Sequence, residues 1–257
     1  MLEKIPSFWR DRIQASAIHL AISLVIAALS AMLVFGVWYP YPYREISGGR
    51  ELFLLLVAVD VILGPLITLT VFSRAKPWTE LRRDLVVVAV VQIAALGYGL
   101  WTVSVARPVH LVFEIDRFSV VHSIDVPDEM LHLTPAGIHA RPWTGPTLLA
   151  LRDFKSNQEQ TDATLAALGG LDLGARPDLW EPYLLAVPKI LKVAKPVSDL
   201  SQRFPNQAEH INAVARSAGR DAQSLRYLPM VGRKSFWTVF LDPVTADVVG
   251  FLPLDSF

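Results

Sequence analysis

Three long, nearly uncharged stretches occupy the first 106 residues of this 257-residue chain, and they constrain its fold more than any other feature. A helix needs about 20 consecutive apolar residues to cross a hydrocarbon core roughly 30 Å thick. Each stretch meets that length, so we predict membrane-spanning helices at about 15–38, 52–72 and 85–106. Together they define a transmembrane bundle over residues 15–106.

After residue 106 the chain becomes polar and mixed in character. Leu111, Phe113 and Ile115 alternate with the residues of a second face, as in a half-buried strand. The predicted fold is therefore a three-helix transmembrane bundle followed by an α+β domain at 107–257, compatible with an antiparallel sheet. The further elements expected are extended segments at 119–124, 235–241 and 246–252, the last two joined as a hairpin, and short helices at 125–131, 157–168 and 207–218.

The Lys and Arg residues near the ends of the predicted helices indicate the orientation of the chain. Basic residues accumulate on the cytoplasmic side of a membrane protein. We therefore place the N-terminal segment 1–14 in the cytoplasm and the domain 107–257 outside, which is the periplasm of a Gram-negative cell. The cytoplasmic set is Lys4, Arg10, Arg12, Arg74, Lys76, Arg82 and Arg83, and the smaller outer set is Arg44, Arg50 and Arg107.

The alternative for the N-terminus is a cleaved signal peptide. The small residues at 28–31 loosely fit a cleavage site. Apolar sequence continues through Trp38, however, and this continuation favours a spanning helix.

One acidic residue, Asp60, lies inside the second predicted span, and Gly64 and Pro65 follow it. An ionised Asp near the middle of a bilayer costs roughly 2.5–3.5 kcal/mol. Proline in a helix interior leaves one carbonyl without its usual donor. A helix that served only as an anchor would not be expected to carry both, so we predict that this segment faces protein, water or a partner.

The rise of about 1.5 Å per residue in a helix allows the depths of polar side chains to be compared. Asp60 and Tyr98 each lie about 12 Å below the outer face, and Ser30 lies at the same level of the first helix. We predict a polar layer of Ser30, Asp60 and Tyr98 inside the bundle. We also expect Gln92 to bond a carbonyl released by Pro65.

Three roles for Asp60 stay open at this point: bundle packing or self-association, recognition of a partner helix, and proton relay or catalysis. A relay would need further ionisable residues, and the one available, His19, is predicted near the cytoplasmic end, far from Asp60. An intramembrane aspartyl protease would need a second acid on a facing helix, and the predicted spans contain none. We therefore favour packing or partner recognition.

Glu114 and Asp116 share a face of the first predicted strand, as a pair of catalytic carboxylates would. We expect instead a solvated face that forms an ion pair with Arg117. The chain has no Cys, its His spacing matches no metal-ligand signature, and it contains no Walker loop, nucleophile elbow or dinucleotide fingerprint. We accordingly predict no metal, no cofactor, no enzymatic activity and, because basic residues are scattered, no nucleic-acid binding.

Several segments together resemble the type IV pilin accessory proteins of the TfpX/TfpZ family. The strongest match is Arg107-Pro108 followed by Phe113-Glu114 and Asp116-Arg117-Phe118. The order and spacing of the matching segments cover residues 15–121, and the match beyond them is looser. The other matching segments are 37–40, 59–66, 83–85, Gln92 and 95–99.

The resemblance implies a multi-pass inner-membrane protein that acts as a non-enzymatic, chaperone-like factor in the assembly of a cognate type IV pilin. Its partners would be the membrane helix and the periplasmic head of that pilin and the lipid bilayer, with self-association as a further option. The alternatives are a pilin-modifying enzyme and a structural or sensor subunit of an envelope complex. The candidate residues are Ser30, Asp60, Gly64, Pro65, Gln92 and Tyr98 in the spans, and Arg107, Pro108, Glu114, Asp116 and Arg117 in the membrane-proximal motif.

Overall fold

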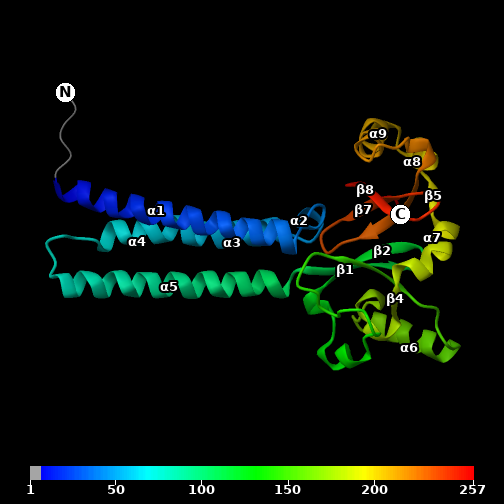
Figure 1. Ribbon diagram of the computed structural model, residues 1–257, viewed down its shortest axis with the longest axis horizontal. Helices are drawn as coiled ribbons and strands as arrows, with labels where there is room; N and C mark the ends of the chain where they lie inside the picture. The colour runs from blue at the N-terminus through cyan, green and yellow to red at the C-terminus, as the bar shows by residue number, and fades with distance from the viewer. Residues whose placement is uncertain (1–6) are drawn as a thin grey trace. The chain divides into compact units, whose positions relative to one another are not determined.

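The computed structural model describes residues 7–257, and these residues form two compact units (Figure 1). Residues 7–37 and Gly49–Val105 make the first, which we call the helical unit. Trp38–Gly48 and Ala106–Phe257 make the second, which we call the sheet unit. The predicted segment 1–14 is thus described only from residue 7 onward, and Lys4 lies outside the described residues.

The helical unit consists of three helices, within the described residues, that are long and apolar enough to cross a membrane. These candidate spans are Phe8–Trp38, Gly49–Val71 and Trp78–Val105, close to the positions predicted from the sequence. The first comprises α1 (Ser7–Leu33) and the π-helical η1 (Val34–Trp38), the second comprises α3 (Gly49–Ala58), the π-helical η2 (Val59–Leu63) and α4 (Gly64–Val71), and the third is α5 (Trp78–Val105).

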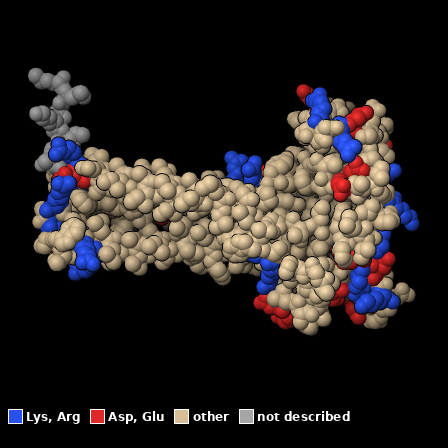
Figure 2. Space-filling model, viewed as in Figure 1, with Lys and Arg blue, Asp and Glu red and all other residues tan. Residues whose placement is uncertain are grey.

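Most apolar side chains of the helical unit point outward rather than into its interior. In each candidate span, no more than 28% of the most apolar stretch is buried inside the unit. The face shown in Figure 2 is almost entirely uncharged between the basic residues at the helix ends. An exposed apolar surface of this extent is expected where lipid or a partner surrounds the helices.

The sheet unit is built on a mixed sheet. Its strands are β1 (Pro108–Glu114), β2 (Arg117–His122), β3 (Thr147–Leu151), β4 (Trp180–Pro182), β5 (Lys195–Pro196), β6 (Arg226–Val231), β7 (Phe236–Leu241) and β8 (Val248–Leu252). Their order is β4-β3-β1-β2-β6-β7-β8, and β5 pairs with β6. The strands β1 and β2 form an antiparallel hairpin, whereas β3 runs parallel to β1 and β6 runs parallel to β2. An antiparallel sheet is therefore the wrong expectation at these two pairings, where long connections separate the paired strands as parallel pairing requires.

The helices of the sheet unit are short. The helices expected at 157–168 and 207–218 are confirmed as α6 and α9, and the hairpin expected at 235–252 is confirmed as the antiparallel pair β7 and β8. The segment 125–131 is not an α-helix, because Pro127 separates two short 3-10 turns. The helices are α2 (Tyr43–Ile46), α6 (Asn157–Leu168), α7 (Val187–Val193), α8 (Val197–Arg203) and α9 (Ala208–Ser217).

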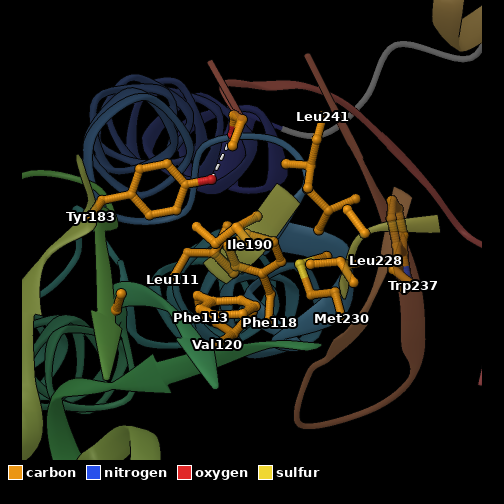
Figure 3. Close-up of a cluster of buried hydrophobic side chains, with 14 of the residues drawn as sticks. Leu111, Phe113, Phe118, Val120, Tyr183, Ile190, Leu228, Met230, Trp237 and Leu241 are labelled. Carbon is orange, nitrogen blue, oxygen red and sulfur yellow. Dashed lines mark hydrogen bonds between the residues drawn. The ribbon is translucent and has the colours of Figure 1, made fainter. Parts of the chain in front are cut away.

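Strand β1 lies in the interior of the sheet unit, and each of its residues is buried. Leu111 and Phe113 belong to the hydrophobic cluster shown in Figure 3, whereas Val109 and Val112 belong to a second cluster. Tyr183 also packs in the first cluster and donates a hydrogen bond from its hydroxyl to the carbonyl of Ala246 at 2.6 Å. Because both of its faces are covered, β1 carries its terminal side chains into a water-poor interior.

The connection between the first two candidate spans is part of this interior. Tyr43 and Ile46 of α2 lie in the hydrophobic cluster of Figure 3. Gly232 leaves space for Ile46, because a Cβ on Gly232 would lie 2.1 Å from Ile46 Cγ1. The backbone N–H of Lys234 donates to the Ile46 carbonyl at 3.2 Å. The segment Trp38–Gly48, which the sequence places within the transmembrane region, therefore folds with the sheet.

Candidate functional site

The helical unit contains a buried carboxylate. Asp60 lies in η2 and is only 9% exposed. Gln92 of α5 donates from Nε2 to Asp60 Oδ1 at 3.3 Å and to the Asp60 backbone carbonyl at 3.4 Å. The donor to this carboxylate is therefore an amide of the third helix.

The Asp60 carbonyl is available to Gln92 because of the local helix register. Val59–Leu63 is π-helical, a form in which a carbonyl bonds the N–H five residues later. If the same hydrogen-bond register continued for one more residue, the Asp60 carbonyl would pair with the N–H of residue 65. Residue 65 is proline and has no N–H. Gln92 supplies the donor that Pro65 lacks, the role that the sequence analysis gives to Gln92.

Glycine at two positions of the helical unit allows the helices to approach. A Cβ at Gly64 would lie 1.8 Å from Gln92 Nε2, so only glycine leaves room for the amide. A Cβ at Gly99 would lie 2.2 Å from Leu56 Cδ1. Gly97, by contrast, has no heavy atom within 4 Å of such a Cβ. Gly64 is therefore a structural requirement of the Gln92–Asp60 contact.

Helix α1 contributes polar side chains at the spacing of one helix turn. Ser16 donates from Oγ to the carbonyl of Pro65 at 2.9 Å. His19 Nδ1 lies 2.6 Å from the hydroxyl of Thr68, and Thr68 is 3% exposed. This pairing was not predicted from the sequence, although the spacing of Ser16, His19 and Ser23 on one helix face is a recognisable signal.

Asp60 and two of these α1 side chains, His19 and Ser23, line one groove of about 480 Å³. His19, Ser23, Thr68 and Gln92 contribute the other polar positions of its lining, and the remaining lining residues are apolar. His19, which the sequence places far from Asp60, borders the same groove, and its own hydrogen-bond partner is Thr68, eight positions beyond Asp60 in the second span.

The structure does not form the predicted layer of Ser30, Asp60 and Tyr98 through hydrogen bonds among residues 7–257. Tyr98 is 69% exposed, and its ring packs against that of Trp101 with centroids 5.7 Å apart. Ser30 is buried at 7% exposure. Equal depth does not place side chains on facing sides of their helices. Tyr98 and Asp60 instead border a second, smaller groove of about 290 Å³.

The first part of the membrane-proximal motif anchors the start of the sheet. Arg107 is 8% exposed and donates from Nη2 to the carbonyls of Pro142 at 3.1 Å and Arg141 at 3.4 Å. Its guanidinium also lies 5.7 Å from the centre of the Trp143 ring. Pro108 is the first residue of β1. These contacts give Arg107 and Pro108 a clear structural role.

The second part of the motif contains a buried carboxylate, contrary to the solvated face expected from the sequence. Glu114 is 4% exposed, whereas Asp116 is exposed because the chain turns back at residues 115–116, with Ile115 at a φ of 51°. Arg117 Nε lies 3.8 Å from Glu114 Oε2, so the expected ion pair is present but long. Burial raises the pKa of Glu114, against the opposing influence of Ser119 and Arg117.

Near this motif, His122, Asp125 and Arg233 form a cluster of polar side chains from segments that are distant in sequence. His122 is 1% exposed, and its Nδ1 and backbone N–H each lie 3.0 Å from Asp125 Oδ2. Arg233 donates from Nη2 to Asp125 Oδ1 at 2.7 Å. Burial acts to raise the pKa of Asp125, but the hydrogen bonds and the electrostatic effect of His122, with a smaller effect of the Arg233 charge, outweigh it and lower that pKa. The pairing with Arg233 spans 108 positions, so no local pattern could have predicted it.

Glu114, Arg117, His122, Asp125 and Arg233 are among the residues lining a polar cavity of about 410 Å³. Two buried atoms of this lining, Glu114 Oε1 and His122 Nε2, accept no hydrogen bond from the described residues. Within residues 7–257, no group of three or more His, Cys, Asp or Glu side chains is arranged to hold a metal ion. The cavity therefore presents charged and hydrogen-bonding side chains.

The fold and its sites define a class of protein: three candidate membrane spans joined to a mixed α+β sheet unit, with a buried carboxylate in each unit. The family model for the fimbrial assembly protein FimB matches residues 7–48. Fimbrial assembly proteins of Dichelobacter nodosus serogroups I and E1 are 34% and 33% identical to this chain over 245 residues, which is 94% of the chain and 95% of each relative. The chain therefore belongs to the fimbrial assembly protein FimB family.

A further relative has a more limited match. The fimbrial assembly protein of Dichelobacter nodosus serogroups C1 and C2 is 40% identical over 111 residues, which is 43% of this chain and 85% of that relative. No solved structure matches the chain. The family is thus shown by sequence, and the arrangement of the sites comes from the structure described above.

Proposed function

We propose that this chain is a non-enzymatic, chaperone-like assembly factor for a cognate type IV pilin, of the TfpX/TfpZ type. Support comes from relatives that are named fimbrial assembly proteins and from the motifs that resemble the accessory family. The distribution of Lys and Arg supports an inner-membrane location with the N-terminus in the cytoplasm and the sheet unit in the periplasm.

The groove beside Asp60 is the observation that carries this proposal. Its walls are apolar and come from all three candidate spans, so an apolar helix could pack there as one membrane helix packs on another. Among the described residues, Asp60 accepts a side-chain hydrogen bond at Oδ1 only. A helix that brought a hydrogen-bond donor to this level would satisfy Oδ2 and would be preferred over lipid, which offers no donor.

The partner proposed for the groove is the membrane helix of the pilin, and the sheet unit would contact its periplasmic head. Two linked contacts raise the effective concentration of each, so neither needs high affinity by itself. Weak individual contacts suit an assembly factor, because the subunit must be released into the growing fibre.

The experiment is co-purification of the tagged chain with the pilin encoded beside it. We expect Asp60→Leu to reduce capture of the pilin by about tenfold, the loss of one charge-assisted hydrogen bond. The control is Gly97→Ala, which alters the same unit at a position with open space around it. Normal capture by Asp60→Leu, or normal piliation of a strain that lacks the gene, would contradict the proposal.

The non-enzymatic part of the proposal has a separate test. An enzyme that modified the pilin would change the mass of the subunit. We expect the intact mass of pilin to be identical in wild-type and deletion strains. A mass difference would show that the chain takes part in a modification and would favour the enzymatic alternative.

A further inference from the structure

The polar cavity of the sheet unit plays no part in the proposed capture of a membrane helix. We propose that this cavity binds a primary ammonium group, of the kind carried by a lysine side chain or by a small free amine. Glu114, Asp172 and Ser119 are the residues that would receive it.

Glu114 is a buried carboxylate with one oxygen that lacks a hydrogen-bond donor. The side chain is 4% exposed, and its Oε1 accepts no hydrogen bond from the described residues. Gly174 makes this position possible, because a Cβ there would lie 2.3 Å from Oε1. The paired cation, Arg117, is 3.8 Å from the other carboxylate oxygen and is 41% exposed. A buried carboxylate oxygen without a donor is costly, so the site favours a ligand that supplies one.

The charges around the cavity indicate the sign of that ligand. Asp125 and Arg233 form a close pair at 2.7 Å and neutralise each other. Glu114 and Asp172 then share the single charge of Arg117. With these carboxylates ionised and the His122 ring neutral, the lining carries one more negative charge than positive, and a monovalent cation would balance it.

The unpartnered atoms indicate that the ligand must donate hydrogen bonds. An ionised Asp125 can only accept, so the proton on the His122 ring lies on Nδ1, which faces Asp125 at 3.0 Å. In the neutral ring the buried Nε2 of His122 is then an acceptor, as Glu114 Oε1 is in its ionised form. A ligand that satisfies these two atoms must therefore donate hydrogen bonds to them.

A primary ammonium group matches these requirements. It carries one positive charge and three N–H donors, and it has no acceptor. Glu114, Asp172 and Ser119 present two carboxylates and a hydroxyl to the same cavity. A divalent metal fits less well, because the described residues provide no group of three ligands, and an anion would be repelled by Glu114.

The test uses the full-length protein in detergent and compares two cations at equal ionic strength. n-Butylammonium has three N–H donors, whereas tetramethylammonium has the same charge and none. From thermal midpoints measured over a concentration series, we expect n-butylammonium to bind about tenfold or more tightly than tetramethylammonium. Equal affinities for the two cations would overturn the proposal. Nα-acetyl-lysinamide identifies the source: tighter binding than n-butylammonium indicates a lysine side chain, and weaker binding a small amine.

Three single substitutions place the binding in this cavity. We expect Glu114→Gln and Asp172→Asn each to weaken n-butylammonium binding by about tenfold. Asp116→Asn is the matched control, because it removes an exposed carboxylate from the same hairpin without touching the cavity. Asp172 is exposed, so its variant gives a readout even if Glu114→Gln does not fold. Binding by Asp172→Asn that equals binding by Asp116→Asn would overturn the assignment.

Discussion

Asp60 in the helical unit and Glu114 in the sheet unit are both buried carboxylates, and each is satisfied at only one oxygen by side chains of the described residues. Asp60 receives the Gln92 amide at 3.3 Å, in a turn whose register frees a backbone carbonyl for the same donor. Glu114 ends a strand and relies on Arg117 at 3.8 Å. The two units thus bury the same chemical group with partners of different kinds.

The difference is the one expected if lipid surrounds the candidate spans and water surrounds the sheet unit. Lipid supplies no hydrogen bonds, so a carboxylate in a membrane span depends on a donor fixed on a neighbouring helix. Gly64 provides the space for that donor. In the sheet unit the partner is a half-exposed Arg117, whose remaining N–H groups can be solvated by water. The partner of the buried carboxylate is thus a fixed amide in the helical unit and a half-exposed cation in the sheet unit.

One histidine in each unit, by contrast, has the same kind of hydrogen-bond partner, a threonine hydroxyl. His19 Nδ1 lies 2.6 Å from the hydroxyl of Thr68, and His110 Nδ1 lies 2.7 Å from the hydroxyl of Thr147. In the sheet unit the other ring nitrogen of His110 also has a partner, the carbonyl of Ala140 at 3.0 Å. A neutral imidazole can be satisfied locally, whereas an ionised carboxylate in the same interior needs a donor or a cation.

The largest expected effect tests whether His110 is held neutral. Burial lowers its pKa from 6.5 to about 4. The neutral His110 ring makes its full contribution to the free energy of unfolding above pH 6.5. This contribution is lost as the pH falls from 6.5 through about 4, because the unfolded chain binds the proton more tightly than the folded chain does. The loss corresponds to about 3 kcal/mol. We expect thermal unfolding of the sheet unit to show this acid-dependent loss, and His110→Gln to flatten it.

The control for His110 is His139→Gln, which changes an exposed histidine of the same unit. The acid-dependent loss should persist unchanged in this variant. If His110→Gln keeps the wild-type pH dependence between 4 and 6.5, another group is responsible.

A smaller effect tests the fixed amide of the helical unit. Gly64→Ala would place a Cβ 1.8 Å from Gln92 Nε2 and displace the amide from Asp60. Overpacking of this kind costs about 1–3 kcal/mol. We expect Gly64→Ala to lower the resistance of the full chain to unfolding by SDS in mixed micelles. Gly97→Ala should have no such effect, and equal behaviour of the two variants would contradict the role given to Gln92.

The smallest effect concerns Glu114, because Ser119 and Arg117 partly offset the rise in its pKa that burial causes. Its pKa is raised above 4.5, so its contribution to stability is complete below pH 4.5 and declines as the pH rises through the raised pKa. We expect Glu114→Gln to remove this decline and to leave the opposite trend of His110 in place. A steeper decline in Glu114→Gln than in wild type would show that the carboxylate is better paired than its contacts indicate.

The sequence was a reliable guide where local composition decides the outcome. The apolar runs gave the candidate spans, and helical periodicity and turn residues gave α6, α9 and the hairpin of β7 and β8. Gln92 was also expected to bond a carbonyl released by Pro65, and it donates to the backbone carbonyl of Asp60. The neighbours proposed for Asp60 were less accurate, because depth along a helix carries no information about rotation around it.

Within the sheet unit, alternation alone predicted a solvated face for Glu114, and this is wrong because both faces of β1 are covered and Gly174 lies directly against the Glu114 carboxylate. The polar cavity was not predicted at all. Its walls bring Asp125 together with Arg233, and Glu114 together with Asp172.

The sequence by itself determined that this chain has three apolar spans, one acidic residue deep within them, and a polar α+β region after them. Those properties depend on composition and on short-range spacing, which the linear chain contains in full. Only the tertiary structure decided that Gln92 is the donor to Asp60, that His19 shares its groove, and that Glu114 is buried. These outcomes depend on helix rotation and on strand pairing between distant segments, and both are set by packing of the whole fold.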